Sequence, residues 1–189
     1  SATLHDFCGS GVEDEETEAK YLEVKKALES KTKRFSKYND AFHKMIKQGD
    51  IIISTDGKKV GQINGLTIAV AGDCSFGQPV RITANTYIGK SGIVNIEREV
   101  AMSGTTHSKG VFILSAYIGE KYAQDIPLSL TASICFEQLY NPVDGDSASS
   151  TELYAILSSL SGVPINQSLA VTGSVNQKGE IQPIGGVNE

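Results

Sequence analysis

The sequence contains no tryptophan, and its only cysteines, Cys8, Cys74 and Cys135, lie far apart without a CxxC pair. Neither a disulfide framework nor a zinc site is indicated, because both need cysteines at suitable spacing. Basic residues are in the minority, with 17 Lys and Arg against 22 Asp and Glu and a formal charge of -5. This balance argues against a surface that neutralises nucleic-acid phosphates. We therefore expect no metal site, no nucleic-acid partner at this domain and a reducing compartment, the cytoplasm.

Long apolar runs are also missing. No run reaches the roughly 18 residues that a membrane helix requires, and the first residues lack the basic and apolar regions of a signal peptide. A membrane partner is therefore not expected. The hydrophobic content of 40% over 189 residues is enough for one compact domain with an appendage.

The first quarter of the chain has the pattern of a long helix. Residues 13–48 contain neither glycine nor proline, and apolar side chains recur there at alternating steps of three and four. They are Tyr21, Val24, Leu28, Phe35, Tyr38, Phe42 and Met45. We expect a long amphipathic helix or a helix pair, and we assign residues 1–49 to an N-terminal helical arm or linker. Its apolar stripe needs a partner, which could be the next domain, a neighbouring subunit or protein upstream.

From Asp50 onward, short β-branched segments alternate with glycine, aspartate and asparagine. This texture predicts an α/β domain of the mixed α+β kind over residues 50–189. Strands are predicted at 51–53, 66–70, 80–88, 93–96, 128–136, 169–172 and 180–184. Helices are predicted at 110–118 and 153–160, the second ended by Gly162 and Pro164.

One motif resembles a phosphate-binding loop but lacks its context. Gly89-Lys90-Ser91 matches the end of GxxxxGK[ST], but Ala84 stands where the first glycine is needed. A strand follows rather than a helix, so no helix N-terminus would face a phosphate. We interpret residues 89–92 as a hairpin turn and expect no nucleotide site in this chain.

Ser147 is the candidate nucleophile, and a histidine is not its expected base. Gly145-Asp146-Ser147 is similar to the nucleophile motif of trypsin-like proteases, but an amphipathic segment follows it, and Ser149 breaks the GxSxG pattern. Only His107 lies in the main domain, and we expect it at the surface or supporting the site from behind. No ligand-spaced companion makes it a metal site.

The position of Ser147 at a strand-to-helix junction allows two roles. Serine is a preferred helix cap, and position alone favours that interpretation. The N-H groups of Ser147 and Ala148 could instead stabilise a developing oxyanion, since the first N-H groups of a helix have no partner within it.

Several ordered segments decide between these roles by resemblance. Asp144-Gly-Asp-Ser147-Ala-Ser-Ser-Thr-Glu152, Ala170-Val-Thr172-Gly173 and Pro183-Ile-Gly185-Gly186 closely resemble the proteolytic domain of Lon peptidases, in their B-type branch. The similarity continues upstream and covers about residues 50 to 189. It implies a serine endopeptidase in which a lysine amine takes the proton of the Ser147 hydroxyl. It further implies that Thr172 orients this amine and that Asp144 lies near the nucleophile, with its role open.

The resemblance also predicts what residues 1–189 lack. The lysine of the family falls directly after the segment matched by residues 185–189, so we expect the domain to be truncated before its catalytic lysine and to be inactive as it stands. Lys178 is the nearest substitute, but it lies in a predicted exposed turn, where a lysine stays protonated.

The family further implies a homo-oligomeric, hexameric ring and polypeptide substrates. No cofactor is expected in this chain, whereas ATP and Mg are expected for an ATPase module elsewhere on the polypeptide. The alternative is a Lon-like ring or polypeptide-binding module without catalysis, and a metal-dependent hydrolase is a poor third.

Overall fold

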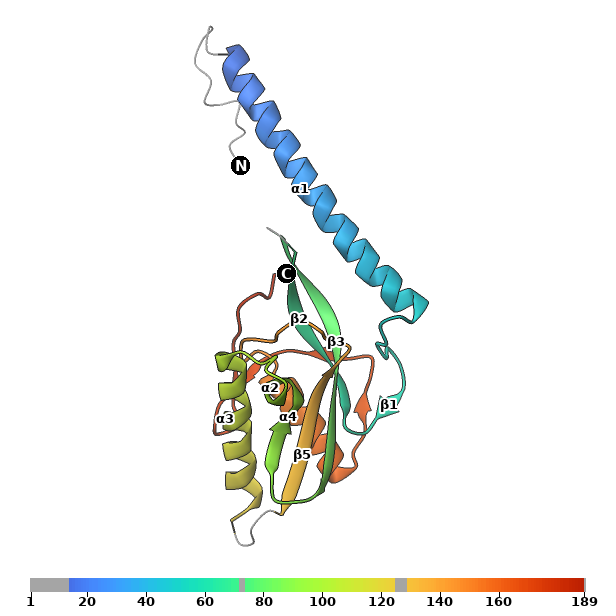
Figure 1. The fold of residues 1–189 in the computed structure, drawn as a ribbon, viewed down its shortest axis with the longest axis vertical. Helices are drawn as coiled ribbons and strands as arrows, with labels where there is room; N and C mark the ends of the chain where they lie inside the picture. The colour runs from blue at the N-terminus through green and yellow to red at the C-terminus, as the bar shows by residue number, and fades with distance from the viewer. Residues whose placement is uncertain (1–13, 72–73, 125–128, 189) are drawn as a thin grey trace. The chain divides into compact units, whose positions relative to one another are not determined.

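A computed structural model describes residues 14–71, 74–124 and 129–188 (Figure 1). The chain divides after His43 into two units, which are described separately. The predicted domain boundary between residues 49 and 50 stays a prediction. Cys8, Cys74 and Leu128 belong to predictions that fall wholly or partly outside the described residues or side chains.

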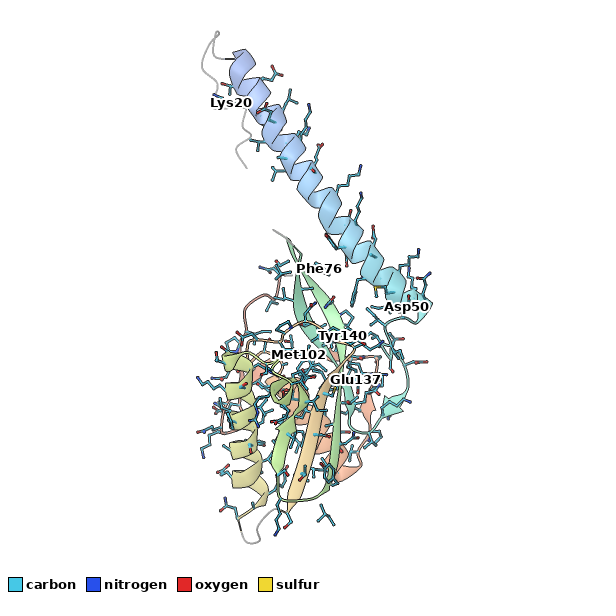
Figure 2. All side chains as sticks on the ribbon, in the orientation of Figure 1. Lys20, Asp50, Phe76, Met102, Glu137 and Tyr140 are labelled. Atoms are coloured by element: carbon cyan, nitrogen blue, oxygen red, sulfur yellow. The ribbon has the colours of Figure 1, made fainter. Side chains whose placement is uncertain are left out.

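The first described element is α1 (Asp14–Gln48), one continuous helix rather than a pair. Figure 2 shows its side chains, with Lys20 and Asp50 labelled near its two ends. The predicted apolar stripe is largely exposed, since Tyr21, Val24, Tyr38 and Met45 each expose more than two fifths of their surface. The lack of glycine and proline over residues 13–48 favours the helix locally.

Five strands of the second unit form one mixed sheet, in the order β4-β5-β3-β2-β7. The long strands β2 (Gln62–Ala71) and β3 (Cys74–Ile88) are antiparallel, and β3 also pairs antiparallel with β5 (Leu130–Glu137). Strands β4 (Gly92–Asn95) and β7 (Ala170–Val171) lie parallel to β5 and β2 at the two edges. The predicted mixed α/β class is confirmed.

Three helices accompany this sheet. They are α2 (Ile96–Glu99), α3 (Thr105–Tyr122) and α4 (Ser149–Ser161), and α4 packs on β2 and β3 with α3 beside it. Helix α4 ends at Gly162, whose φ of 68° lies in the left-handed region that glycine tolerates. Two small ribbons complete the unit, one from β1 (Lys58–Lys59) and β6 (Ile165–Asn166), the other from β8 (Ser174–Val175) and β9 (Ile181–Gln182).

The core lies between the sheet and these helices. The apolar side of the alternation predicted for β5 is confirmed, because Leu130, Ala132, Ile134 and Phe136 are all buried, although Thr131 of the predicted polar side is buried too. Helices α3 and α4 contribute Leu114, Ile118, Leu153 and Ile156 to the same cluster. Burial of these side chains supplies the main stabilisation of the unit.

Two local predictions are wrong. Residues 51–53 form no strand, because the N-H of Ile51 bonds back to the carbonyl of Met45 and the N-H of Ile52 bonds to the Gln138 side chain. The turn at residues 89–92 is not a hairpin, since β5 inserts between the strands that it joins. Thr131 of β5 holds this turn by accepting the N-H of Ser91 at 3.2 Å.

Candidate functional site

Ser147 lies on a tight turn between β5 and α4, here named the Ser147 turn (residues 144–148). Gly145 has a φ of 86°, a left-handed conformation that glycine adopts without steric cost. The turn brings the chain directly into α4, whose cap position is Ala148. The predicted strand-to-helix junction is therefore present, although a loop separates β5 from the turn.

The segment after β7 fixes the position of Ser147. The Ser147 carbonyl accepts two hydrogen bonds, from the N-H of Gly173 at 2.7 Å and from the hydroxyl of Thr172 at 3.1 Å. The N-H of Ser150 donates in return to the Gly173 carbonyl at 3.0 Å. Thr172 thus lies beside Ser147 and contacts its backbone carbonyl, while its predicted role of orienting a lysine amine stays a prediction.

Strand β8 adds two further ties. The Ser149 hydroxyl accepts the N-H of Val175 at 2.9 Å, and the Ser174 hydroxyl donates to the Asp146 carboxylate at 2.7 Å. Ser149 is only 1% exposed. Side chains on both sides of Ser147 therefore hold the turn, and this hydrogen-bond network makes its backbone rigid.

The hydroxyl of Ser147 itself is unused. Within the described residues it forms no hydrogen bond, and Ala148 caps α4 without a side-chain bond. The capping interpretation of the Ser147 side chain is therefore wrong. The N-H groups of Ser147 and Ala148 also donate to no described backbone carbonyl, whereas those of Ser149 and Ser150 do.

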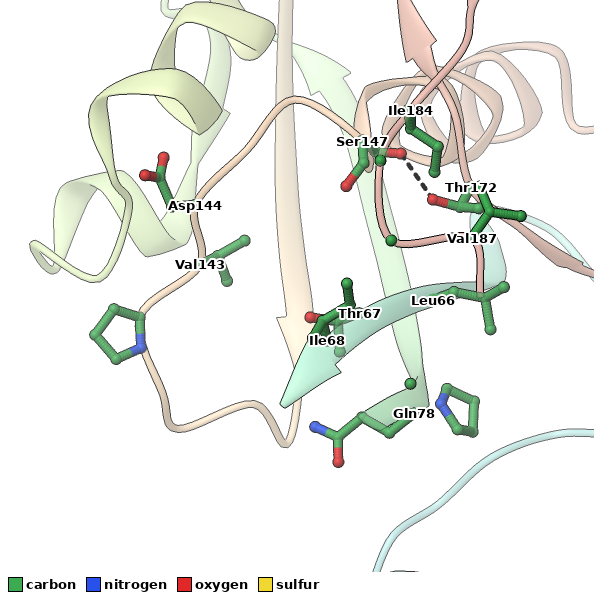
Figure 3. A pocket seen from close by; sticks show the side chains of 15 residues that line it. Leu66, Thr67, Ile68, Gln78, Val143, Asp144, Ser147, Thr172, Ile184 and Val187 are labelled. Carbon is green, nitrogen blue, oxygen red and sulfur yellow. Dashed lines mark hydrogen bonds between the residues drawn. The ribbon is translucent and has the colours of Figure 1, made fainter. Parts of the chain in front are cut away.

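Ser147 opens into a pocket of about 420 Å³. Figure 3 shows Ser147 and Thr172 on one side and β2 on the other, with the labelled side chains of Leu66 and Ile68 on that strand. The walls are mostly apolar. The remaining lining comes from β2 and β3, from the residues before Ser147 and from the end of the described chain: Thr67, Gly77, Gln78, Pro79, Pro142, Val143, Asp144, Ile184, Gly185, Gly186 and Val187.

Asp144, the first residue of the Ser147 turn, caps the N-terminus of α3. Its Oδ1 accepts the N-H groups of Thr106 at 3.2 Å and His107 at 3.3 Å, while the cap position of α3 is a glycine, Gly104, without a side chain. The hydrogen bond from the Gly145 N-H, followed by that from His107, lowers the pKa of Asp144, because both favour the carboxylate. Asp144 therefore links the Ser147 turn to α3.

His107 lies in the interior behind the Ser147 turn. It is 1% exposed, so the surface alternative is wrong, while the other alternative, support of the site from behind, stays a prediction. The imidazole Nε2 lies 3.1 Å from Glu152 Oε1, and Nδ1 lies 2.9 Å from the Ser103 hydroxyl. Asn95 donates to the same Glu152 oxygen at 3.2 Å.

The pKa values of this pair shift in one direction. Burial alone would lower the pKa of His107, but the hydrogen bond and negative charge of Glu152, with Glu97 and Asp144 behind them, raise it above the ordinary value of 6.5. Burial raises the pKa of Glu152, and this effect outweighs the influence of His107. The folded pair therefore binds a proton more tightly than the separated groups do.

Glu152, Asn95 and Ser149 are site residues that sequence reasoning missed. Glu152 is the last residue of the motif at residues 144–152, but no role was predicted for it. A signal was present, because Glu152 lies at the i and i+4 spacing from Ile156 and hence on the buried face of α4. A carboxylate on such a face requires a buried partner.

Lysines are absent from the described lining of the Ser147 pocket. Lys178 lies in the turn between β8 and β9, with 72% of its side chain exposed, and pairs with Glu120 at 3.3 Å. The predicted exposed turn is thus confirmed. In the described ranges, moreover, no three His, Cys, Asp or Glu residues gather as metal ligands, and no helix is long and apolar enough to cross a membrane.

A sheet backed by two helices, with a free serine hydroxyl at the start of one of them, is an arrangement suited to acyl transfer. Residues 54–189 match the family described as the Lon protease (S16) C-terminal proteolytic domain. The chain belongs to this family. It is thus identified as a peptidase domain.

The relatives agree with this assignment. A putative Lon protease homolog of Escherichia coli K12 is 43% identical over 146 residues, which cover 76% of this chain and 25% of that protein. The corresponding protein of Haemophilus influenzae is 36% identical, over 74% of this chain and 24% of that protein. The archaeal Lon protease of Archaeoglobus fulgidus is 33% identical, over 71% of this chain and 21% of that protein. The chain thus spans about a quarter of the first two relatives and a fifth of the third.

Proposed function

We propose that this chain is the proteolytic part of an ATP-dependent serine endopeptidase, in which Ser147 Oγ attacks the carbonyl carbon of a polypeptide substrate. The observation that carries the proposal is the free Ser147 hydroxyl, which lines the pocket on a turn held by hydrogen bonds to the Ser147 carbonyl, the Asp146 carboxylate and the Ser149 hydroxyl. A nucleophile needs such freedom, because a hydroxyl that caps a helix is not available for attack.

The negative oxygen that forms in this attack would be stabilised by the N-H groups of Ser147 and Ala148. Neither donates to a backbone carbonyl among the described residues. Both lie at the start of α4, where the helix macrodipole adds positive potential. Donors fixed at this position lower the barrier to acyl transfer, and the loss of one typically costs about 10²- to 10³-fold in rate.

The proton of Ser147 would pass to a lysine amine, with Thr172 as the residue that orients it. No described lysine lines the pocket, and Lys178 is engaged with Glu120. We propose that a lysine outside residues 1–189 supplies the amine, so that these residues alone do not hydrolyse peptides. A buried amine near neutral pH is a usable base, whereas an exposed ammonium has no lone pair to offer.

An open sheet edge beside Ser147 would hold the substrate. Strand β7 pairs with β2 only at Asn64 and Gly65, and within the described residues no strand pairs with the same edge from Leu66 to Ala71. Leu66 and Ile68 of this stretch also line the Ser147 pocket. Every second residue along the edge directs its N-H and C=O outward. An extended polypeptide can therefore add as a strand, with its side chains against the apolar walls.

This mode of binding predicts a periodic effect of substrate N-methylation. The longer gene product that contains these residues is assayed with a set of peptides that each carry one N-methyl group. The loss in kcat/KM should alternate with the position of the methyl group along the peptide. Methylation of amides that face β2 should lower kcat/KM by about fivefold, corresponding to a hydrogen bond worth on the order of 1 kcal/mol. Methylation of the intervening amides should cost little. A loss without a period of two would contradict strand addition.

Covalent labelling with a fluorophosphonate tests the function itself. The reagent is applied to residues 1–189 and to the longer gene product that contains them, and the adduct is located by peptide mass spectrometry. Modification of Ser147 in the longer protein supports the nucleophile, and slower or absent modification of residues 1–189 supports the external lysine. Equal labelling of both chains would show that the amine is not external.

A second function is favoured by the absence of a lysine among the described pocket residues. In that case the domain would be a ring or polypeptide-binding module without catalysis, and neither chain would be labelled although both were folded. For either function we propose a cytoplasmic, hexameric ring and an ATPase module with ATP and Mg elsewhere on the polypeptide.

A further inference from the structure

His107 contacts the chain on both sides of Ser147. Its backbone N-H donates to Asp144 at the start of the Ser147 turn, and its imidazole bonds to Glu152 in the first turn of α4. Farther along α3, Gly110 lies in van der Waals range of the turn, since a Cβ there would meet Asp146 Cβ at 3.5 Å. His107 alone thus forms hydrogen bonds both to the segment that enters the Ser147 turn and to the segment that leaves it.

The pair is fully enclosed and has few other partners. Glu152 is 0% exposed, and its second oxygen, Oε2, has no hydrogen-bond partner within the described structure. Glu97 of α2 is also buried and uses one oxygen to accept the N-H of Phe136 at 2.7 Å. No described lysine or arginine forms an ion pair with either carboxylate. His107 is therefore the group that compensates a buried negative charge here.

We propose that His107 and Glu152 form a positioning pair that holds the Ser147 turn in its reactive geometry through hydrogen bonds on both sides of the serine. The proposal rests on the function proposed for Ser147, but it concerns how the turn is held rather than the reaction itself. Neither residue contacts the pocket that would hold the substrate. Their effect on reactivity would therefore pass through the backbone of the turn.

The sign of the pH dependence follows from the pKa directions. Folding raises the pKa of His107 above 6.5. The stability that the protonated imidazole adds to the folded state is therefore complete below pH 6.5 and is lost as the pH rises through the pKa of His107 in the folded state. The raised pKa of Glu152 acts in the same direction. Glu97 and Asp144 also face the pair, and their negative charges favour the protonated form of His107. Burial raises the pKa of the Cys135 thiol beside Glu97 to about 11, so it stays neutral over this range.

The test is a pH titration of residues 1–189 by NMR. The imidazole nitrogens of His107 and the backbone amides of Ser147 and Ala148 are followed together. We expect the amides to shift with the midpoint of His107, above pH 6.5. In His107→Gln, whose side-chain amide can still donate to Glu152 but does not titrate, this transition of the amides should disappear. His43→Gln on the exposed face of α1 is the matched control and should leave it unchanged.

Amides that stay still while His107 titrates, or that titrate unchanged in His107→Gln, would overturn the proposal. If His107→Gln does not fold, Ser103→Ala decides, because loss of the Nδ1 partner should move the midpoints of His107 and of the two amides together. Independent movement would refute the coupling.

A parallel measurement separates this proposal from the proposed function. In the longer gene product, the rate of Ser147 labelling should change with pH at the same midpoint as His107, and His107→Gln should remove this change. Absence of labelling contradicts only the proposed function, since the amide shifts need no base. Labelling without this change contradicts only the positioning pair.

Discussion

Replacing Ser147 with alanine is expected to lower peptide hydrolysis by the longer gene product by a factor on the order of 10³ or more, since loss of a nucleophile leaves only binding and oxyanion stabilisation. The same change in residues 1–189 should alter the free energy of unfolding by less than about 0.5 kcal/mol. The reason is structural: the hydroxyl forms no hydrogen bond within the described residues. Hydrolysis rates and urea unfolding measure the two effects.

Ser149→Ala is the matched control, because it removes a hydroxyl from the same stretch with the opposite consequence. Its Oγ accepts the N-H of Val175 in the interior. An orphaned buried N-H should lower the free energy of unfolding by about 1–3 kcal/mol, while hydrolysis should fall much less than in Ser147→Ala because the nucleophile is still present. Equal loss of hydrolysis in both variants would mean that the turn is merely distorted and that Ser147 is not the nucleophile.

Much of the fold follows from patterns that local physics makes strict. The alternation of Leu130, Ala132, Ile134 and Phe136 predicted a half-buried strand, because a one-residue slip would move this set out of the core. The stop at Gly162 was equally strict, since its left-handed conformation ends a helix. Ser147 and Thr172 were predicted from motifs, and in the structure the Thr172 hydroxyl lies 3.1 Å from the Ser147 carbonyl oxygen.

The errors concern contacts between distant parts of the chain. Residues 51–53 have β-branched side chains, but no strand among the described residues pairs with them, and the Gln138 side chain accepts the N-H of Ile52 instead. The turn at residues 89–92 was assigned to a hairpin because no local signal reveals that β5 inserts between β3 and β4.

The buried pair behind the site illustrates the same limit. His107 and Glu152 belong to different helices, and their hydrogen bond depends on how α3 and α4 pack. Sequence alone showed a histidine without a partner, which is compatible with the surface. Only the packing shows that the imidazole and the carboxylate compensate each other.

Gly104→Ala is expected to have the second large effect, because this glycine makes room for Asp144. A Cβ at Gly104 would lie 2.3 Å from Asp144 Cγ and 2.8 Å from its Cβ, too close for either atom to stay in place. Asp144 would leave its cap on α3, a loss worth about 0.5–2 kcal/mol. The entry to the Ser147 turn would move with it, so labelling of Ser147 in the longer gene product should fall by at least about tenfold, as expected for a small misplacement of reacting groups.

Two further variants divide this effect into its parts. Gly119→Ala, also in α3 but with nothing within 4 Å of its Cβ, should stabilise the helix by up to about 1 kcal/mol and leave labelling unchanged. Asp144→Ala removes the cap without the clash. If Gly104→Ala slows labelling more than Asp144→Ala does, displacement of the turn is the cause. If the two are equal, the cap alone connects α3 to the reactivity of Ser147, and if neither slows labelling, the turn is positioned from the β7 and β8 side only.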